Sequence, residues 1–233
     1  MKKIIAKVLE LKVGNVKTSK LQNNKRELLV SAIKKRPIQK AYLTKVGFSE
    51  DEQGDTLHHG GENKAVFLFS ALTYEKINAY FNSNFDMSGV ASFGENLVLS
   101  KVCENDVCVG DIFEIGQSII QITQPRQPCW KLSASTKEKD MTKITFINGF
   151  TGWYAKVLKE GYISKEDEVI LQKRTHNNLT IAKLNELMVD PMSDEEATKE
   201  ALLCDDLGKA FFASLTKRYE LREKDDQFSY YHT

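Results

Sequence analysis

The first half of the chain is a series of short apolar segments separated by glycine turns. Between residues 3 and 124 these segments are rich in Val, Ile, Leu and Phe, and several alternate apolar with polar side chains. They are IIAKVLELKV, ELLVSAIKK, KAVFLF, ENLVL, DVCVGDIFEIG and SIIQITQP. Short segments with this alternation are typical of β-strands, and many such strands between turn residues are typical of a barrel or sandwich. The sequence therefore predicts a mostly β body.

Two helices are expected to interrupt this body. Four apolar side chains of residues 71–82 approximate one helical face, namely Leu72, Ile77, Tyr80 and Phe81. Residues 150–160, FTGWYAKVLKE, are followed by Gly161, a typical helix-stop residue. We expect both helices to cover the outside of the β body or to close one of its ends.

The pattern changes after Arg174. Residues 180–223 contain three segments with helical spacing, TIAKLNELMVD, SDEEATKEALLC and LGKAFFASLTKRYE. Ser193 followed by Glu196 predicts a capping box for the second helix. An appendage of this size is marginal as an independent core, so it is expected to dock on the β body or on another subunit. Residues 174–178 are the expected hinge.

Charge and cysteine usage exclude several classes of protein. The 33 Lys and Arg residues against 32 Asp and Glu residues give a net charge of +1, which argues against a nucleic-acid partner. Charged residues interrupt the N-terminal apolar stretch, and no apolar run is long enough to span a membrane. The four cysteines form no CxxC pair, as expected for reduced thiols in the cytoplasm.

The loop QPRQPCWKL, residues 124–132, is the first candidate site. Its two prolines fix the backbone, so residues 124–128 are expected to be stiff and non-helical. The loop presents Cys129 between Arg126 and Lys131, and neighbouring cations stabilise the reactive thiolate. The alternative is a small buried cysteine that only packs. Cys103, Cys108 and Cys204 have no such setting and are expected to be structural.

The segment GDTLHHGGENKAV, residues 54–66, is the second candidate. Its histidines, His58 and His59, precede two glycines whose backbone can approach a ligand closely, Gly60 and Gly61. Adjacent histidines in an extended segment point to opposite sides, so at most one is expected to face a given pocket. Lys64 could add a cation at the same edge. A solvent-exposed loop is the alternative, and a zinc site is disfavoured because no further ligands are spaced to help.

Two weaker patterns complete the set. The first is SFGENL, residues 92–97, which places Glu95 and Asn96 at a glycine turn. The second is SAIKKRPI, residues 31–38, which places Lys34 and Arg36 in a short basic cluster that could hold a phosphate. Each alone is more typical of a turn or a solvated face. The sequence contains no GxxxxGKS, GxGxxG or GxSxG motif, so nucleotide hydrolysis, Rossmann-type redox chemistry and serine hydrolysis are disfavoured. A cysteine hydrolase would need His59 as its base.

Taken in order, SAIKKRP, QGDTLHHGGENKAV, FGENL, VCVGDIFEIG, ITQPRQPCWKL, TGWYAKVLKEG and EVILQKR resemble the MOSC domain family, named for the C-terminal domain of molybdenum-cofactor sulfurase. The resemblance covers roughly residues 5–174. The three-helix extension resembles the stand-alone bacterial YiiM-like branch. One departure is the segment Lys165–Glu168, KEDE, where family members often have a Gly-Asp turn.

This resemblance implies a mostly β fold with added helices. Residues 1–176 would form a MOSC-type β-barrel similar to the barrel of pyruvate kinase, and residues 177–233 a C-terminal three-helix extension and tail. It also implies that Cys129 either ligates molybdenum in a pterin cofactor or carries sulfur as a persulfide. The pyridoxal-phosphate domain of full-length sulfurases has no counterpart in this chain.

The leading hypothesis is a molybdenum-cofactor-dependent oxidoreductase that reduces N-hydroxylated compounds, such as hydroxylaminopurine-type bases, with electrons from a separate donor protein. Its metal ligand would be Cys129, and His59 would position substrate or donate a proton. The cofactor-binding residues would be Lys34, Arg36, His58, Gly60, Gly61, Lys64, Glu95, Asn96, Arg126, Trp130 and Lys131.

Two other hypotheses stay open. The first is a sulfur carrier or cofactor-binding module that holds a Cys129 persulfide without redox turnover. The second is an interaction protein whose thiol is incidental. The helical extension and the aromatic tail QFSYYHT offer apolar surface, so we expect a homodimer.

Overall fold

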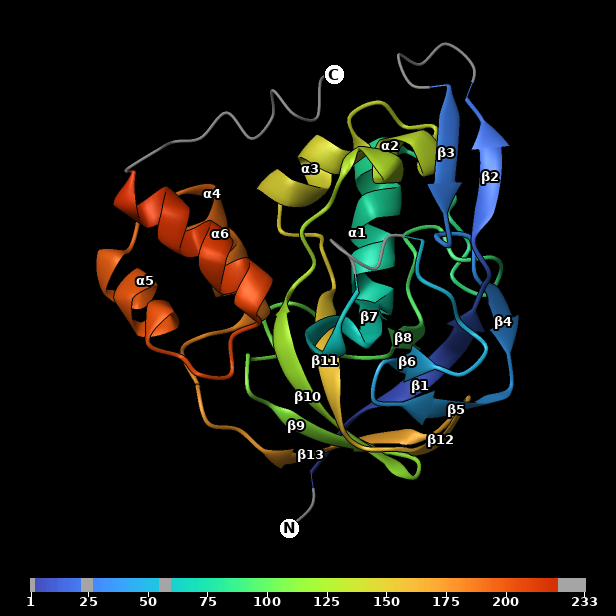
Figure 1. Ribbon diagram of the computed structural model, residues 1–233, viewed down its shortest axis with the longest axis horizontal. Coiled ribbons are helices and arrows are strands. Elements are labelled where there is room, and N and C mark those ends of the chain that lie inside the picture. The colour runs from blue at the N-terminus through green and yellow to red at the C-terminus, as the bar shows by residue number, and fades with distance from the viewer. Residues whose placement is uncertain (1–2, 22–26, 55–59, 222–233) are drawn as a thin grey trace.

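The structure, a computed structural model, describes residues 3–21, 27–54 and 60–221 and is built around a closed β-barrel (Figure 1). The barrel has 7 strands in the spatial order β13–β9–β10–β11–β7–β8–β1, and pairing of β1 with β13 closes it. The strands are β1 (Lys3–Val13), β7 (Val66–Ser70), β8 (Leu97–Leu99), β9 (Ile112–Ile115), β10 (Ser118–Pro125), β11 (Trp153–Lys159) and β13 (Glu168–Lys173). Only β7 and β8 pair in parallel among these neighbours, so the barrel is mixed. The expectation of a mostly β barrel with added helices is confirmed.

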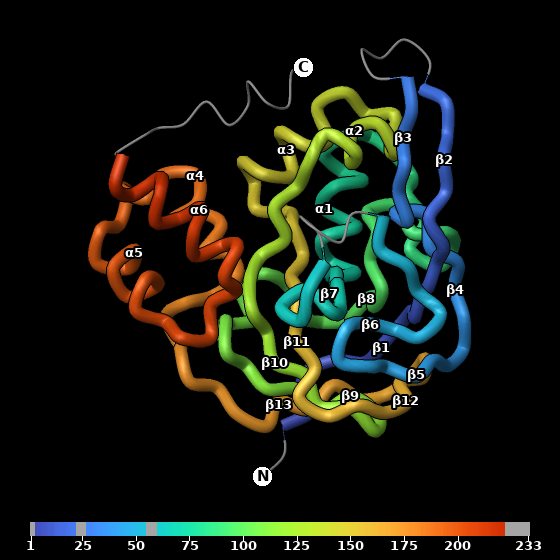
Figure 2. Tube along the Cα trace, in the orientation of Figure 1, coloured from blue at the N-terminus to red at the C-terminus, as the bar shows by residue number. Residues whose placement is uncertain are grey.

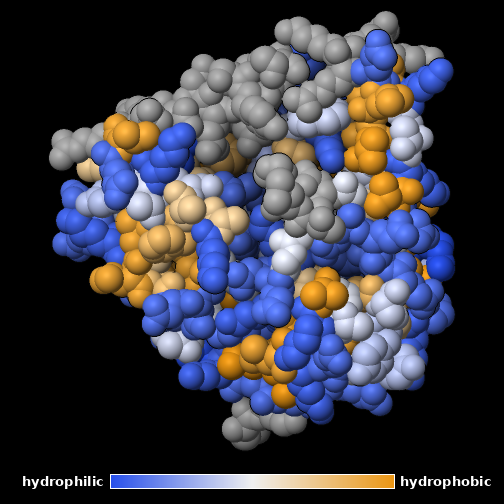
Figure 3. All heavy atoms as spheres, in the orientation of Figure 1, coloured by the Kyte–Doolittle hydropathy of each residue, from blue (hydrophilic) through white to orange (hydrophobic). Residues whose placement is uncertain are grey.

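Shorter strands extend the barrel. β4 (Arg36–Ile38) pairs with the end of β1, while β5 (Lys40–Thr44), β6 (Gly47–Phe48) and β12 (Gly161–Ser164) form a separate three-stranded sheet. A two-stranded ribbon of β2 (Lys17–Lys20) and β3 (Leu28–Ser31) lies at the edge of the molecule (Figure 2). Hydrophobic side chains gather on the surface over this ribbon, where Leu28 and Val30 are exposed (Figure 3).

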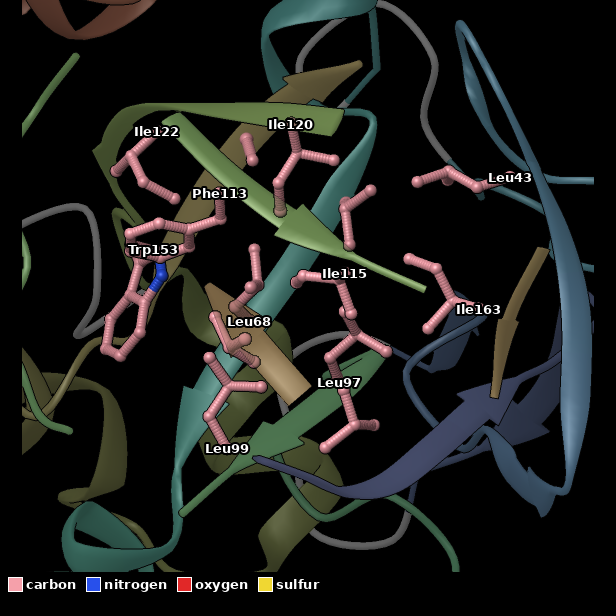
Figure 4. Packing of buried hydrophobic residues seen from close by; sticks show 14 of the residues in the cluster. Leu43, Leu68, Leu97, Leu99, Phe113, Ile115, Ile120, Ile122, Trp153 and Ile163 are labelled. Carbon is pink, nitrogen blue, oxygen red and sulfur yellow. The ribbon is translucent and has the colours of Figure 1, made fainter. Parts of the chain in front are cut away.

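Apolar side chains fill the barrel interior. The residues labelled in Figure 4 pack together in one cluster. Those from barrel strands are Leu68, Leu97, Leu99, Phe113, Ile115, Ile120, Ile122 and Trp153, while Leu43 of β5 and Ile163 of β12 come from the three-stranded sheet. Each of them is fully buried. Burial of one such side chain contributes about 1.5–3 kcal/mol, so this cluster fixes which face of each strand points inward. The core therefore holds the strand ends, and the loops that follow them, in fixed positions.

The prediction of a helix over residues 150–160 is wrong, because most of this segment is strand β11. Its side chains alternate between buried and half-buried positions from Trp153 to Val157, which is the period of a strand. Gly152 precedes the strand with φ +64, and a side chain there would meet the Leu68 carbonyl oxygen at 2.5 Å. The turn at Gly152 therefore starts a strand that pairs with β7 and β10.

The other expected helices are present. α1 (Ala71–Phe81) begins at Ser70, whose hydroxyl accepts hydrogen bonds from two backbone amides of its first turn. The three C-terminal helices are α4 (Ile181–Val189), α5 (Glu195–Leu202) and α6 (Lys209–Glu220). The expected Ser193 capping box is wrong, because the side chain of Asp194 caps α5 and Ser193 bonds the Asp190 carbonyl. None of the helices in the described ranges is long and apolar enough to cross a membrane.

Three further short helices complete the described ranges. They are the 3₁₀ helix η1 (Glu62–Lys64), α2 (Trp130–Thr136) and α3 (Met141–Ile147). The sequence did not predict α2 or α3. α2 follows the proline loop directly and packs against α3, so the pair covers one end of the barrel.

The three-helix extension docks on the β body through an apolar cluster. Phe211 and Leu215 of α6 and Leu184 of α4 pack with Val109 from the barrel and Phe146 from α3. The backbone of the extension is also tied to β10, since the Gly208 amide donates to the Thr123 carbonyl at 3.0 Å. The domain boundary at residues 176 and 177 stays a prediction.

Residues 174–178, the expected hinge, are held at both ends. Arg174 donates to both carboxylate oxygens of Asp111, at 2.8 and 2.6 Å. His176 contacts the Asp206 carboxylate of the extension at 3.2 Å. These side-chain contacts tie the segment to both parts of the chain, and the hinge stays a prediction.

Candidate functional site

A pocket opens at the barrel end where the proline loop meets the segment after β3. Its wall is formed by residues from six parts of the chain: Ser31, Ala32, Ile33, Lys35, Asp51, Glu52, Gln53, Gly54, Lys64, Phe67, Phe93, Gly94, Asn96, Arg126, Cys129, Lys131 and Tyr154. We call this the thiol pocket. It contains four cationic side chains and two carboxylates, so its lining is cationic although the whole chain is nearly neutral.

Cys129 is placed by the turn that joins the proline loop to α2. Residues 126–129 are non-helical, as expected, and Cys129 is the residue before the first turn of α2. Its carbonyl accepts hydrogen bonds from the Leu132 amide at 2.9 Å and from the Thr142 hydroxyl of α3 at 3.0 Å. These bonds anchor the backbone while the side chain lines the pocket. The thiol therefore sits on a fixed backbone at a partly exposed position.

The other three cysteines are buried. Burial raises the pKa of the Cys103 and Cys204 thiols, and it raises the pKa of Cys108 to about 11. A buried thiol that stays protonated is a poor nucleophile and a poor metal ligand. The expectation that these three cysteines are structural agrees with their positions.

Arg126 brings a buried cation to the same pocket. Its residue is 8% exposed, its amide donates to the Gly152 carbonyl at 3.1 Å, and its guanidinium lies 5.6 Å from the centre of the Phe67 ring. The Nη1 atom is buried and has no hydrogen-bond partner among the described residues. A buried guanidinium nitrogen without a partner is costly, so this atom is available to an anionic or carbonyl group of a ligand.

Tyr154 lies beside Arg126 and is the aromatic part of this wall. Its ring centre is 5.1 Å from that of Phe67. Burial raises the pKa of the Tyr154 hydroxyl, and the adjacent Arg126 guanidinium opposes that rise. The hydroxyl therefore remains a neutral hydrogen-bond donor at neutral pH.

Asp51 organises the opposite wall. Its carboxylate accepts from the Lys35 ammonium, from the Asn96 side-chain amide at 2.9 Å and from the Gly14 backbone amide at 2.8 Å. Burial lowers the pKa of Lys35 more than the Asp51 carboxylate raises it. Sequence analysis missed Asp51, whereas Lys35 belongs to the basic segment SAIKKRPI that it identified. The acidic run Glu50–Glu52 just before the histidine segment was the available signal.

Asn96 lines the thiol pocket, and Glu95 lies behind this part of its wall. Glu95 accepts hydrogen bonds from the Lys12 ammonium at 2.7 Å, from the Tyr74 hydroxyl at 2.6 Å and from the Phe93 amide at 3.1 Å. The side chains of Lys12 and Glu95 are both 0% exposed, so Glu95 cannot touch a ligand in the thiol pocket. Asn96 reaches the pocket and also bonds the Lys12 carbonyl at 3.1 Å. The buried ion pair between Lys12 and Glu95 therefore fixes the glycine turn of residues 92–97.

The structure brings together some of the residues expected from sequence. Lys64, Asn96, Arg126, Cys129 and Lys131 line the thiol pocket. The remaining described candidates are outside its lining: Lys34, Arg36, Gly60, Gly61, Glu95 and Trp130.

Three of those outlying candidates have other surroundings. The Arg36 side chain is 61% exposed and pairs with Glu50 at 3.4 Å. Partial burial lowers the pKa of Lys34, which lies near Glu95. Gly61 has φ +97 and precedes η1. His58 and His59 lie outside the described residues.

The chemistry of the pocket suits an anionic ligand that carries a soft metal. A thiolate is a soft ligand, guanidinium and ammonium groups bind phosphate, and the Arg126 Nη1 atom lacks a partner in the described chain. No group of three or more His, Cys, Asp or Glu side chains gathers as a metal site within the described ranges. A metal at Cys129 would therefore need most of its ligands from an organic cofactor. The described residues fit such a group.

Comparisons with known proteins show the family and agree with the fold. The family model described as MOSC domain matches residues 55–170. The Bacillus subtilis (strain 168) protein YflK, described as uncharacterized, is 31% identical over 212 residues, which cover 91% of this chain and 93% of that protein. A Gibberella moniliformis protein named Reductase is 28% identical over 182 residues, or 78% of this chain and 32% of that protein. The crystal structure of YiiM from Geobacillus stearothermophilus superposes with a TM-score of 0.74 at 27% identity, covering 91% of this chain and 98% of that one.

Proposed function

This chain belongs to the MOSC domain family, in the stand-alone bacterial YiiM-like group, and on that premise we propose that the thiol pocket binds a molybdenum cofactor and reduces N-hydroxylated compounds. Cys129 is the proposed protein ligand of the metal. The observation that supports this most is a partly exposed thiol in the same pocket as a buried guanidinium nitrogen that has no partner among the residues the structure describes.

The cofactor would be held mainly by cations. Arg126, Lys64 and Lys131 line the pocket around Cys129, and the phosphate of a pterin cofactor needs such groups. When bound, the molybdenum centre would supply the two-electron chemistry of the reaction. The electrons would come from a separate donor protein.

Reduction of an N-hydroxylated compound consumes protons, and residues of this chain can provide them. The net change is R–NHOH plus two protons and two electrons to R–NH2 plus water, so the leaving oxygen must be protonated. Lys35 lines the pocket and burial lowers its pKa, which makes its ammonium a better acid than an exposed lysine. Asp51 holds this ammonium at the pocket wall.

Elemental and pterin analysis tests the proposal. The chain is purified from a host that makes the molybdenum cofactor, alongside its Cys129→Ser variant and a known molybdenum enzyme as a loading control. We expect about one molybdenum and one pterin per wild-type chain, reduction of an N-hydroxylated base with a chemical electron donor, and loss of activity in the variant.

Two outcomes would contradict it. A wild-type chain without molybdenum and pterin, in a host that loads the control enzyme, excludes the cofactor. A labile sulfur on Cys129, seen as a mass increase of one sulfur atom that a reductant removes, would support the sulfur-carrier alternative instead.

A further inference from the structure

A second cavity lies at the junction between the barrel and the helical extension. Its volume is about 430 Å³, which is in the range of small-molecule sites. It is lined by Lys76 of α1, by residues 104–105, by residues 147–150 after α3, and by α4 with the turn that follows it. α3 and α4 are neighbours at this junction (Figure 1). We call this the junction cavity.

Glu104 forms the buried end of the junction cavity. The residue is 4% exposed, and its carboxylate accepts from the Thr73 hydroxyl at 2.6 Å and from the Gly152 amide at 2.9 Å. No ion pair joins Glu104 to a cation within the described ranges. Carboxylates this deeply buried are rarely left without a cationic partner, because desolvation penalises the charge. Each of its oxygens can accept one more hydrogen bond.

The surrounding polar groups are mostly acceptors. Asn185 is 7% exposed, and its Nδ2 atom donates to the Gly149 carbonyl at 3.3 Å and to the Thr151 hydroxyl at 2.9 Å. The amide nitrogen is thus engaged, so the carbonyl oxygen is the group that Asn185 can offer to a ligand. Glu186 of α4 and Asp190, which directly follows the helix, add two further carboxylates to the lining, and Lys76 contributes its single ammonium. Glu186 also lies 3.6 Å from the Lys183 ammonium.

The junction cavity also has apolar wall residues, beside the polar side chains of Asn105, Asn148 and Ser193. Ile147 is 45% exposed at the end of α3, and the side chains of Phe150 and Val189 are half-buried against the same space. A ligand that suits these walls has an aliphatic body and a hydrogen-bond-donating cationic head. A bare metal ion does not suit them, because the carboxylates do not converge as a metal site in the described ranges.

We propose that the junction cavity binds a primary alkylammonium ligand whose head group pairs with the Glu104 carboxylate and whose chain packs against Ile147, Phe150 and Val189. An ammonium group has three donors, enough to satisfy Glu104 and the Asn185 carbonyl oxygen together. Glu186 and Asp190 increase the local concentration of cations at the entrance. This site is independent of the function proposed for the thiol pocket.

Titration calorimetry of the full chain with butylamine tests the proposal, with 1-butanol as the neutral analogue. We expect saturable binding of butylamine at one site per chain and none of 1-butanol. Glu104→Gln keeps the size of the side chain and an oxygen that accepts from the Gly152 amide, while its NH2 group can donate to the Thr73 hydroxyl. Because the charge is removed, butylamine should bind at least about tenfold more weakly. Lys76→Met removes a competing cation and should tighten binding by roughly twofold or more.

The matched control is Glu52→Gln, which makes the same charge change in the thiol pocket. It should leave the butylamine affinity unchanged. The proposal is overturned if butylamine shows no saturable binding up to about 10 mM, a concentration well above a millimolar dissociation constant. It is also overturned if Glu104→Gln binds butylamine as tightly as the wild type, or if Glu52→Gln is the variant that loses binding.

Discussion

The thiol pocket and the junction cavity are tied to the same glycine and have opposite charge. The Gly152 carbonyl accepts from the Arg126 amide, and the Gly152 amide donates to the Glu104 carboxylate. Cations dominate the lining of the first site, and carboxylates dominate the lining of the second. The net charge of +1 does not reveal that the two sites have opposite charge. We therefore expect charge in this chain to act on ligands locally and not through a global field.

The largest loss of stability is expected from a substitution at Gly152, the residue that contacts both sites. In Gly152→Ala the new Cβ would lie 2.5 Å from the Leu68 carbonyl oxygen, at a φ of +64. We expect a loss of more than about 4 kcal/mol in the free energy of unfolding, because the backbone cannot relax without breaking the β11 pairing. Urea denaturation followed by circular dichroism measures it.

The control for this variant is Gly89→Ala, where the new Cβ meets only atoms of Asp86, at 3.1 Å or more, and φ lies outside the left-handed region. It should lose less than about 1 kcal/mol. Equal stability of Gly152→Ala and the wild type would contradict the role given to this turn.

A change in the buried ion pair behind the wall of the thiol pocket comes next. Glu95→Gln leaves the fully buried Lys12 ammonium without its counterion, and we expect a loss of about 3 kcal/mol in the free energy of unfolding. The double variant Lys12→Met with Glu95→Gln should recover at least half of that loss, because no buried charge remains. Thermal and urea unfolding of the three proteins give the comparison. A single variant that loses less than about 1 kcal/mol would show that the ion pair does not hold the pocket wall.

Arg126 and Arg36 offer a matched pair of variants, because Arg126 lines the thiol pocket and Arg36 lies outside its lining. Arg126→Met should reduce retained molybdenum and pterin by about tenfold or more, because the proposed anionic ligand loses a charged donor. Arg36→Met makes the same change on an exposed side chain paired with Glu50, and it should leave the content unchanged. Metal and pterin analysis after gel filtration measures both. The same loss in the two variants would mean that the pocket does not select the cofactor.

The smallest expected effect is a pH dependence of the free energy of unfolding that comes from Glu104 in the junction cavity. Burial raises the pKa of Glu104 above its ordinary value of 4.5, so the folded chain binds this proton more tightly than the unfolded chain does. The resulting stability is fully present below about pH 4.5 and is lost as pH rises through the raised pKa of the folded state. Glu104→Gln removes this titration.

The difference in unfolding free energy between Glu104→Gln and the wild type should therefore shift in favour of the variant as pH rises above 4.5. The cavity groups Lys76, Glu186 and Asp190 are the same in both proteins, so their titration largely cancels. A difference that stays constant from pH 4 to pH 8, roughly the range over which a raised carboxyl pKa acts, would contradict a buried, charge-penalised Glu104.

The strands and the thiol could be predicted from sequence because their signals are local. Alternating apolar residues identified most barrel strands, and the two prolines identified the non-helical loop before Cys129. Residues 150–160 were misassigned because Gly161 suggested a helix stop, whereas the two-residue period from Trp153 onward decided the structure.

The rest of the site depends on contacts between distant segments. Lys12 and Glu95 are 83 residues apart, and Lys35 meets Asp51 only because β1, β4 and the loop after β6 converge at one end of the barrel. Tyr154 was missed for the same reason, since it reaches Arg126 only once β10 and β11 pair. The junction cavity has no sequence motif at all, because four separate segments form it.

Selective alkylation of the folded chain tests the central claim most directly, namely that Cys129 is a reachable thiol in a pocket while the other cysteines are sealed. The folded protein is treated with a small excess of iodoacetamide, denatured, labelled with a second reagent and mapped by mass spectrometry. We expect the first label on Cys129 alone, and protection of Cys129 when the cofactor is bound. A first label spread over Cys103, Cys108 and Cys204, or an unlabelled Cys129 in cofactor-free protein, would contradict the claim.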